Sequence, residues 1–217
     1  MDFSFAPEQE DLRREARGFL EANPEPSTEQ LAELGWVGVL ASDEFTFLDA
    51  AVLFEELGRV HYGGPWVEQE VGNDRRRLLA AYALQAVGIG ARATELALAY
   101  VSEREQFGRK IGSYQAVSHP LVDAYVQVEL ARSLAYWAAW CVAEDDEQAD
   151  VACAAAKAQA TEAAVFACER SIQAHGGIGF TWEHPLHRYY KRALWLESAL
   201  GHGRTHRAEV ARSLLSS

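Results

Sequence analysis

The sequence predicts an all-α protein in which a small N-terminal helical domain is followed by an up-and-down four-helix bundle. Two observations support this prediction. Apolar residues recur at spacings of three and four through most of the 217 residues, which is the period of helices with one buried face. Runs that alternate β-branched and polar residues, the pattern of a half-buried strand, are nearly missing. The breakers in the second half leave about thirty residues for each helix, or roughly 45 Å of length.

Three helices are expected in the N-terminal domain. Pro7 suits the first turn of a helix, where no backbone N–H is needed, and the apolar period then continues to the Asn23-Pro24 break. Ser27 can cap a short second helix that ends near Gly35. A third helix is expected over 48–57, with a glycine directly after it as the stop.

Breakers also divide the rest of the chain. Residues 61–73 contain a Gly-Gly-Pro sequence and no clear period, which indicates a linker. Beyond it, a two-glycine turn, an acidic run and a glycine cluster separate long periodic segments. The expected bundle helices are 74–103, 114–143, 148–174 and 185–214, the last of them broken near Gly201 and Gly203. The expected domains are therefore 1–60 for the N-terminal helices, 61–73 for the linker and 74–217 for the bundle.

The composition argues against several classes of partner. A formal net charge of -12 disfavours nucleic acid and anionic membranes, because both need a basic face on the protein. The sequence has no basic leader before an apolar run and no long apolar stretch, so a cytoplasmic protein without a membrane span is expected. Cys141, Cys153 and Cys168 lie in alanine-rich helical segments without C-x-x-C spacing. They are therefore expected to be small core residues, and no metal site is predicted.

The first of two motifs lies between the first two bundle helices. Residues 104–112 read REQFGRKIG and are followed by Tyr114-Gln115-Ala116. Taken alone, this segment fits a basic turn in which Arg104 offsets the negative end of the preceding helix dipole. It also closely resembles the R-x-x-F-G-x-x-I…Q-A signature of acyl-CoA dehydrogenases.

The second motif follows the third bundle helix. Residues 173–181 read QAHGGIGFT. Consecutive glycines let the bare backbone approach a ligand, although they also suit a helix end and a tight turn. The segment resembles the Q-x-x-G-G-x-G-F/Y-T element of the same family, and the two motifs stand in family order. Because the FAPEQ, LGW and EELGR stretches of the N-terminal region resemble the family too, the likeness covers nearly the whole chain.

The resemblance implies an incomplete flavin site. Family members carry a β-domain that binds FAD within the same subunit, and 61–73 is too short to hold such a domain. The bundle motifs of the family instead help to hold the ADP half of the FAD that belongs to the neighbouring subunit of a dimer. A guanidinium suits the pyrophosphate, and aromatic and amide groups suit the adenosine. The FAD-contact candidates implied by the resemblance are Arg104, Gln106, Phe107, Gln115, Gln173, Gly176 and Gly177.

The resemblance also implies that the catalytic base is missing. In the family, a glutamate near the C-terminus removes the α-proton of the acyl-CoA while hydride passes to the flavin. Counting without gaps from either side places this glutamate at Leu200, and a base position that some members use instead falls at Leu78. One glutamate and three basic residues near Leu200 could substitute for the base only weakly. We expect the glutamate to be solvated and the basic residues to form a solvated or interface cluster. These candidates are Glu197, His202, Arg204 and His206.

Three functions follow as hypotheses. The leading one is a non-catalytic subunit that pairs with a full-length acyl-CoA dehydrogenase and shares its FAD, as heteromeric members of the family do in bacterial sterol side-chain degradation. The second is a homodimer that uses the helical scaffold for non-redox chemistry of the cyclase, lyase or hydratase type, through the four substitute residues. The third is a scaffold that binds neither flavin nor thioester.

Overall fold

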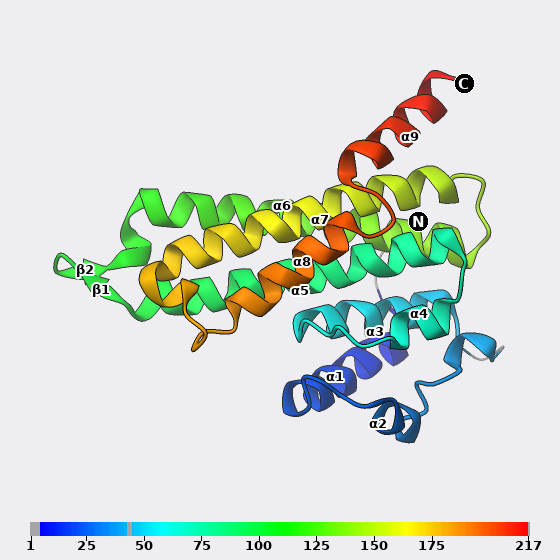
Figure 1. Ribbon diagram of the computed structural model, residues 1–217, viewed down its shortest axis with the longest axis horizontal. Helices are drawn as coiled ribbons and strands as arrows, with labels where there is room; N and C mark the ends of the chain where they lie inside the picture. Colours follow the sequence, from blue (N-terminus) through cyan, green and yellow to red (C-terminus); the bar gives the residue numbers. More distant parts are fainter. Residues whose placement is uncertain (1–4, 43–44, 217) are drawn as a thin grey trace.

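The computed structural model describes residues 5–42 and 45–216, and it confirms the all-α fold (Figure 1). Caps determine where the short N-terminal helices begin. Ser27 and Thr46 each accept a hydrogen bond from the backbone N–H three residues later, and Gln30 and Asp49 bond back to the two cap residues. The helices of this unit are α1 (Pro7–Ala22), α2 (Thr28–Glu33), the 3-10 turn η1 (Val39–Ala41) and α3 (Phe47–Arg59).

The segment 61–73, expected to be a linker, carries a helix. Helix α4 (Trp66–Val71) begins directly after Pro65. Trp66 is fully buried, and its indole N–H donates to the carbonyl oxygen of Trp36 at 3.1 Å. A helix of six residues is too short to show the helical period in the sequence, and the Gly-Gly-Pro sequence before it predicts a loop. Tertiary burial of one large aromatic residue therefore orders this segment against the N-terminal helices.

The bundle helices follow the predicted order closely. Figure 1 shows α5, α6 and α7 lying alongside one another, with α8 packed on α7 and α9 leaving the end of the bundle. The predicted break of the last helix is confirmed, since Leu200 and Gly201 in the turn between α8 and α9 have φ values of 60° and 108°. The bounds are α5 (Arg75–Glu103), α6 (Gln115–Ala143), α7 (Ala149–His175), α8 (Leu186–Ser198) and α9 (Gly203–Leu215).

Short elements connect these helices at one end. A hairpin of β1 (Glu105–Gln106) and β2 (Arg109–Lys110) follows α5, and the 3-10 turn η2 (Ile111–Ser113) leads into α6. The 3-10 turn η3 (Gly176–Phe180) continues from α7. Within the ranges that the structure describes, this hairpin is the only sheet.

Two glycines allow the N-terminal unit to dock on the bundle. A Cβ added at Gly88 of α5 would overlap the carbonyl oxygen of Glu55, and one added at Gly58 of α3 would overlap the carbonyl oxygen of Gln85. Helices α3 and α5 therefore cross with their backbones in contact, which only residues without a side chain permit.

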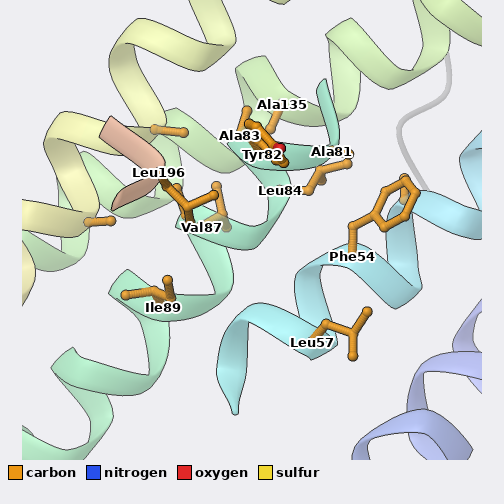
Figure 2. Close-up of a cluster of buried hydrophobic side chains, with 14 of the residues drawn as sticks. Phe54, Leu57, Ala81, Tyr82, Ala83, Leu84, Val87, Ile89, Ala135 and Leu196 are labelled. Atoms are coloured by element: carbon orange, nitrogen blue, oxygen red, sulfur yellow. The ribbon is translucent and has the colours of Figure 1, made fainter. Parts of the chain in front are cut away.

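One hydrophobic core spans both parts of the chain. Figure 2 shows members of this core from four helices: Phe54 and Leu57 of α3, Leu84 of α5, Ala135 of α6 and Leu196 of α8. The three cysteines are buried, as predicted. Among the described residues, no helix combines the length and apolar character needed to cross a membrane. Because they share this core, the N-terminal helices are packed firmly against α5 and α8.

Candidate functional site

Both family-like motifs lie at the same end of the bundle, as Figure 1 shows for the hairpin and η3. A small apolar cluster joins them there. Val101 of α5 and Leu121 of α6 are buried, and Ile111, Val117 and Ala174 pack against them. Residues that are about seventy positions apart in the sequence are thereby held on one surface. The two motifs therefore form one continuous surface at this end of the bundle.

The hairpin turn presents Phe107 to solvent. Phe107 and Gly108 have φ values of 54° and 79°, as a two-residue hairpin turn of this kind requires. The positive φ strains a non-glycine residue by about 1 to 2 kcal/mol, and the phenyl ring is 93% exposed. Nearby, the Arg109 guanidinium stacks on Tyr114 at 3.8 Å, and the Tyr114 hydroxyl donates to the carbonyl oxygen of Gln106 at 3.2 Å. These contacts fix the hairpin while leaving Phe107 uncovered.

The second motif is held by a stack of rings beneath it. His175 is buried, its Nδ1 bonds to the carbonyl oxygen of Ser171 at 2.7 Å, and its ring lies between Tyr100 at 4.4 Å and His184 at 4.3 Å. Gly176 then ends α7 with a φ of 64°. The sequence pattern does not mark this stack, although His175 stands inside the motif. The spacing of the three rings gives no signal before the fold is known.

All seven FAD-contact candidates are exposed. A Cβ added at Gly176 or Gly177 would meet nothing within 4 Å, so bare backbone faces open space there. Ile178, Phe180 and Trp182 add exposed apolar surface next to this backbone. A guanidinium, three amide side chains and accessible backbone are groups that fit the ADP part of FAD. These groups form an open surface rather than an enclosed pocket. Such a surface suits one side of a binding site whose other side comes from a second subunit.

Leucines occupy both positions where the resemblance places a base. Leu200 lies in the turn between α8 and α9 and is 45% exposed. Leu78 lies in the first turn of α5 and packs half-buried against the core. Neither side chain can accept a proton.

The four substitute candidates do not form one cluster. His202 Nδ1 lies 3.0 Å from Glu197 Oε1 at the surface, and Arg204 is exposed. The expectation of a solvated or interface position is wrong for His206, which is fully buried because α9 packs on α7 through it. Its Nε2 donates to the carbonyl oxygen of Gly201 at 3.1 Å, and burial lowers the pKa of its imidazole. His206 is therefore buried apart from Glu197, His202 and Arg204, which are partly or fully exposed.

The sequence reading missed Lys157 of α7. This lysine is fully buried, and burial lowers the pKa of its ammonium to about 8. Its Nζ lies 3.4 Å from the carbonyl oxygen of Gly201. The available signal was a single charged residue in the run VACAAAKAQA, where the helical period places it on the buried face.

The comparisons with known proteins agree with this fold and these motifs. Residues 74–215 match the family described as "Acyl-CoA dehydrogenase, C-terminal domain". The chain therefore belongs to the acyl-CoA dehydrogenase family.

Curated relatives are longer than this chain. Acyl-CoA dehydrogenase IpdE2 of Mycobacterium tuberculosis is 42% identical over 116 residues, which are 54% of this chain and 34% of that protein. The probable acyl-CoA dehydrogenase YngJ of Bacillus subtilis is 38% identical over 130 residues, which are 60% of this chain and 34% of that protein. The matched part thus spans about a third of the length of these relatives.

Solved structures show the same fold over the whole chain at low identity. The ChsE4-ChsE5 complex from Mycobacterium tuberculosis gives a TM-score of 0.88 at 18% identity and covers 100% of both chains. Butyryl-CoA dehydrogenase from Megasphaera elsdenii gives 0.82 at 17% identity, covering 99% of this chain and 100% of that one. A further neighbour, PigA, was solved as an FAD complex and gives 0.76 at 16% identity, with 99% of each chain covered.

Proposed function

We propose that this chain is the non-catalytic subunit of a heteromeric acyl-CoA dehydrogenase that introduces an α,β double bond into an acyl-CoA. A full-length partner supplies the β-domain, the substrate pocket and the glutamate, and 61–73 stands here in place of that β-domain. The observation that carries the proposal is the contrast between two sites in one chain. The motif surface has seven exposed residues suited to a cofactor, whereas leucines, Leu200 and Leu78, stand at the two positions where the family resemblance places a base.

The chain's own residues would hold the partner's cofactor rather than react with the substrate. FAD supplies the hydride acceptor when it is bound. Arg104 would pair with the pyrophosphate, and Gln115 and Gln173 would bond to the adenosine end. Phe107, which the hairpin turn holds outside the bundle, would cover an apolar or ring surface of the cofactor or of the partner.

An apolar stripe on α6 supports pairing with another subunit. Val122, Tyr125, Val126 and Leu130 are all about half exposed, and their spacing places them on one face of the helix. Exposed apolar patches of this kind are typical of protein interfaces. Among the fold neighbours, the ChsE4-ChsE5 complex contains two named components, which adds support to a heteromeric assembly.

Co-expression with a full-length acyl-CoA dehydrogenase encoded beside this chain tests the proposal. The expected result is a stable complex with the yellow absorption of bound flavin, whereas the chain purified alone is colourless. Arg104→Ala should lower the flavin content of the complex without dissociating the subunits. Arg14→Ala, which removes an exposed arginine of α1 outside the motif surface, is the matched control.

Two results would contradict the proposal. One is recovery of this chain only with itself, while the dehydrogenase retains its full flavin content and activity alone. The other is acyl-CoA dehydrogenase activity in the isolated chain, because that would require a base that neither leucine position supplies.

A further inference from the structure

A cationic groove lies between the N-terminal helices and α8. It consists of two neighbouring cavities of about 470 and 560 Å³ that share His61 and Arg188. The first is bounded by the ends of α1 and α3 and by the start of α8, and the second by the 61–64 turn and the middle of α8. The seven FAD-contact candidates line neither cavity. The groove is therefore distinct from the motif surface.

The charge of the groove is opposite to that of the chain. The net charge of the chain is -12. The cationic residues that line the two cavities outnumber the acidic ones by six to three. The cations are Arg17, Arg59, Arg92, Arg188, Lys191 and Arg192, and the acids are Glu21, Glu25 and Glu56. A concentration of positive charge in a concave, half-enclosed site favours an anionic ligand.

On the N-terminal wall, carboxylates hold the arginines in place. Glu56 is 1% exposed and accepts hydrogen bonds from Arg17 at 2.7 and 2.9 Å. Arg59 donates to both carboxylate oxygens of Glu95 at 2.7 and 2.9 Å, and Arg92 donates to the same carboxylate at 3.2 Å. Two glutamates thus position three guanidinium groups. This wall is preorganised, but Glu21, Glu56 and Glu95 balance its three arginines, so the surplus of positive charge in the groove lies on the α8 wall.

On the α8 wall, the cations are less fully paired. Arg188, Lys191 and Arg192 share one face because they stand at helical spacings of three and four. Of the described carboxylates, only Glu25 lies within ion-pair distance of the three, at 3.5 Å from Arg188. Arg192 donates to Gln85 at 2.9 Å, but its Nε is buried without a hydrogen-bond partner, and burial lowers the pKa of its guanidinium. The buried Nε of Arg192 is out of reach of a ligand, so the donors that the α8 side offers are those of the exposed Arg188 and Lys191.

Flat rings line the second cavity beside these donors. Trp195 is 44% exposed and His61 is partly exposed, whereas Tyr62 is buried and contributes only an edge to the lining. The Arg192 guanidinium lies 4.1 Å from the centre of the Trp195 ring. The backbone at Gly63 is bare, since an added Cβ there would meet nothing within 4 Å. Arginine and lysine bind phosphate oxygens, and aromatic rings stack on planar heterocycles.

We propose that this groove binds a small molecule of the mononucleotide class, with its phosphate at Arg188 and Lys191 and its ring system against the exposed ring of Trp195. The combined volume accommodates a ligand of that size, because small-molecule pockets commonly measure about 300 to 1,000 Å³. This binding does not depend on pairing with a dehydrogenase subunit.

Calorimetric titration of the purified chain with AMP, adenosine and inorganic phosphate tests the proposal. AMP should bind at one molecule per chain and at least tenfold more tightly than adenosine, with an affinity that falls as salt rises. Arg188→Ala/Lys191→Ala should weaken AMP binding at least tenfold. The matched control is Arg14→Ala/Arg212→Ala, which removes the same charge from exposed positions that line neither cavity. Circular dichroism and thermal unfolding establish that both double variants are folded.

Three outcomes would overturn the proposal. The first is the absence of AMP binding into the millimolar range, and the second is equal binding of adenosine or no effect of Arg188→Ala/Lys191→Ala. The third is loss of AMP binding in Arg104→Ala with retention in the α8 double variant, because this would place AMP on the motif surface. A failure to pair with a dehydrogenase would leave these titrations unaffected, so the two proposals fail separately.

Discussion

The ammonium nitrogen of Lys157 lies 3.4 Å from the carbonyl oxygen of Gly201, the same oxygen that accepts a hydrogen bond from His206 at 3.1 Å. Both basic side chains are fully buried. They hold the turn between α8 and α9, in which Leu200 adopts a positive φ of 60°. The turn where the resemblance places the base is therefore anchored by the chain's own buried basic groups.

Replacing Lys157 with methionine should change how stability depends on pH. The pKa of this lysine is lowered by burial from 10.5 to about 8 in the folded chain. Between these values the unfolded chain binds more protons, so the unfolding free energy of the wild type rises with pH. Relative to Lys157→Met, the wild type should gain about 2 to 3 kcal/mol between pH 8 and pH 10.

Urea unfolding of both proteins across this range measures the effect. The comparison between the two variants removes the contribution of other groups, such as the buried cysteine thiols, whose pKa values are raised by burial. If the unfolding free energies of the wild type and Lys157→Met changed with pH in the same way, the lysine would not be desolvated in the folded chain.

Gly88→Ala should separate α3 from α5. An added methyl group would overlap the carbonyl oxygen of Glu55, which is backbone and cannot turn away. The expected loss is about 3 kcal/mol of unfolding free energy, the upper end of the usual cost of overpacking, because the clash is with backbone. The control is Gly18→Ala on the exposed face of α1, where an added Cβ meets nothing within 4 Å. There the gain in helix propensity should stabilise the chain by about 0.5 to 1 kcal/mol. Equal effects of the two substitutions in denaturant unfolding would contradict the close crossing.

Phe107→Asn should separate folding from cofactor binding. Asparagine tolerates a positive φ better than phenylalanine does, and the exposed ring contributes almost no burial within the chain. The isolated variant should therefore unfold at the same temperature as the wild type or slightly above it. In complex with a dehydrogenase subunit, flavin retention or subunit affinity should fall several-fold. A complex with unchanged flavin content and unchanged affinity would remove Phe107 from the proposed interface.

Glu56→Gln should destabilise the chain by about 2 to 4 kcal/mol. The carboxylate is buried, accepts two hydrogen bonds from Arg17 and lies 3.6 Å from Arg59. Its removal would leave positive charge without compensation in a partly buried place. Glu10→Gln is the control, because Glu10 belongs to an exposed pair with Arg13 and should have an effect below about 1 kcal/mol. Thermal unfolding at low and high salt would distinguish the two positions.

Much of the architecture follows from local patterns in the sequence. The long helices α5, α6 and α7 could be predicted because apolar period, breakers and glycine stops are properties of neighbouring residues. The two motif segments could be recognised for the same reason. The sequence also determined that Leu200 and Leu78 carry no carboxylate, whatever the fold around them.

Only the tertiary structure decided which distant residues meet. Helix α4 forms because Trp66 finds a buried partner thirty residues away, and His206 is buried because α9 packs on α7. The groove likewise joins arginines of α1, α3, α5 and α8, and no local spacing relates them. The period of a helix is a short-range pattern in the sequence. Burial and charge at a site depend instead on long-range packing, because distant segments come together only when the chain folds.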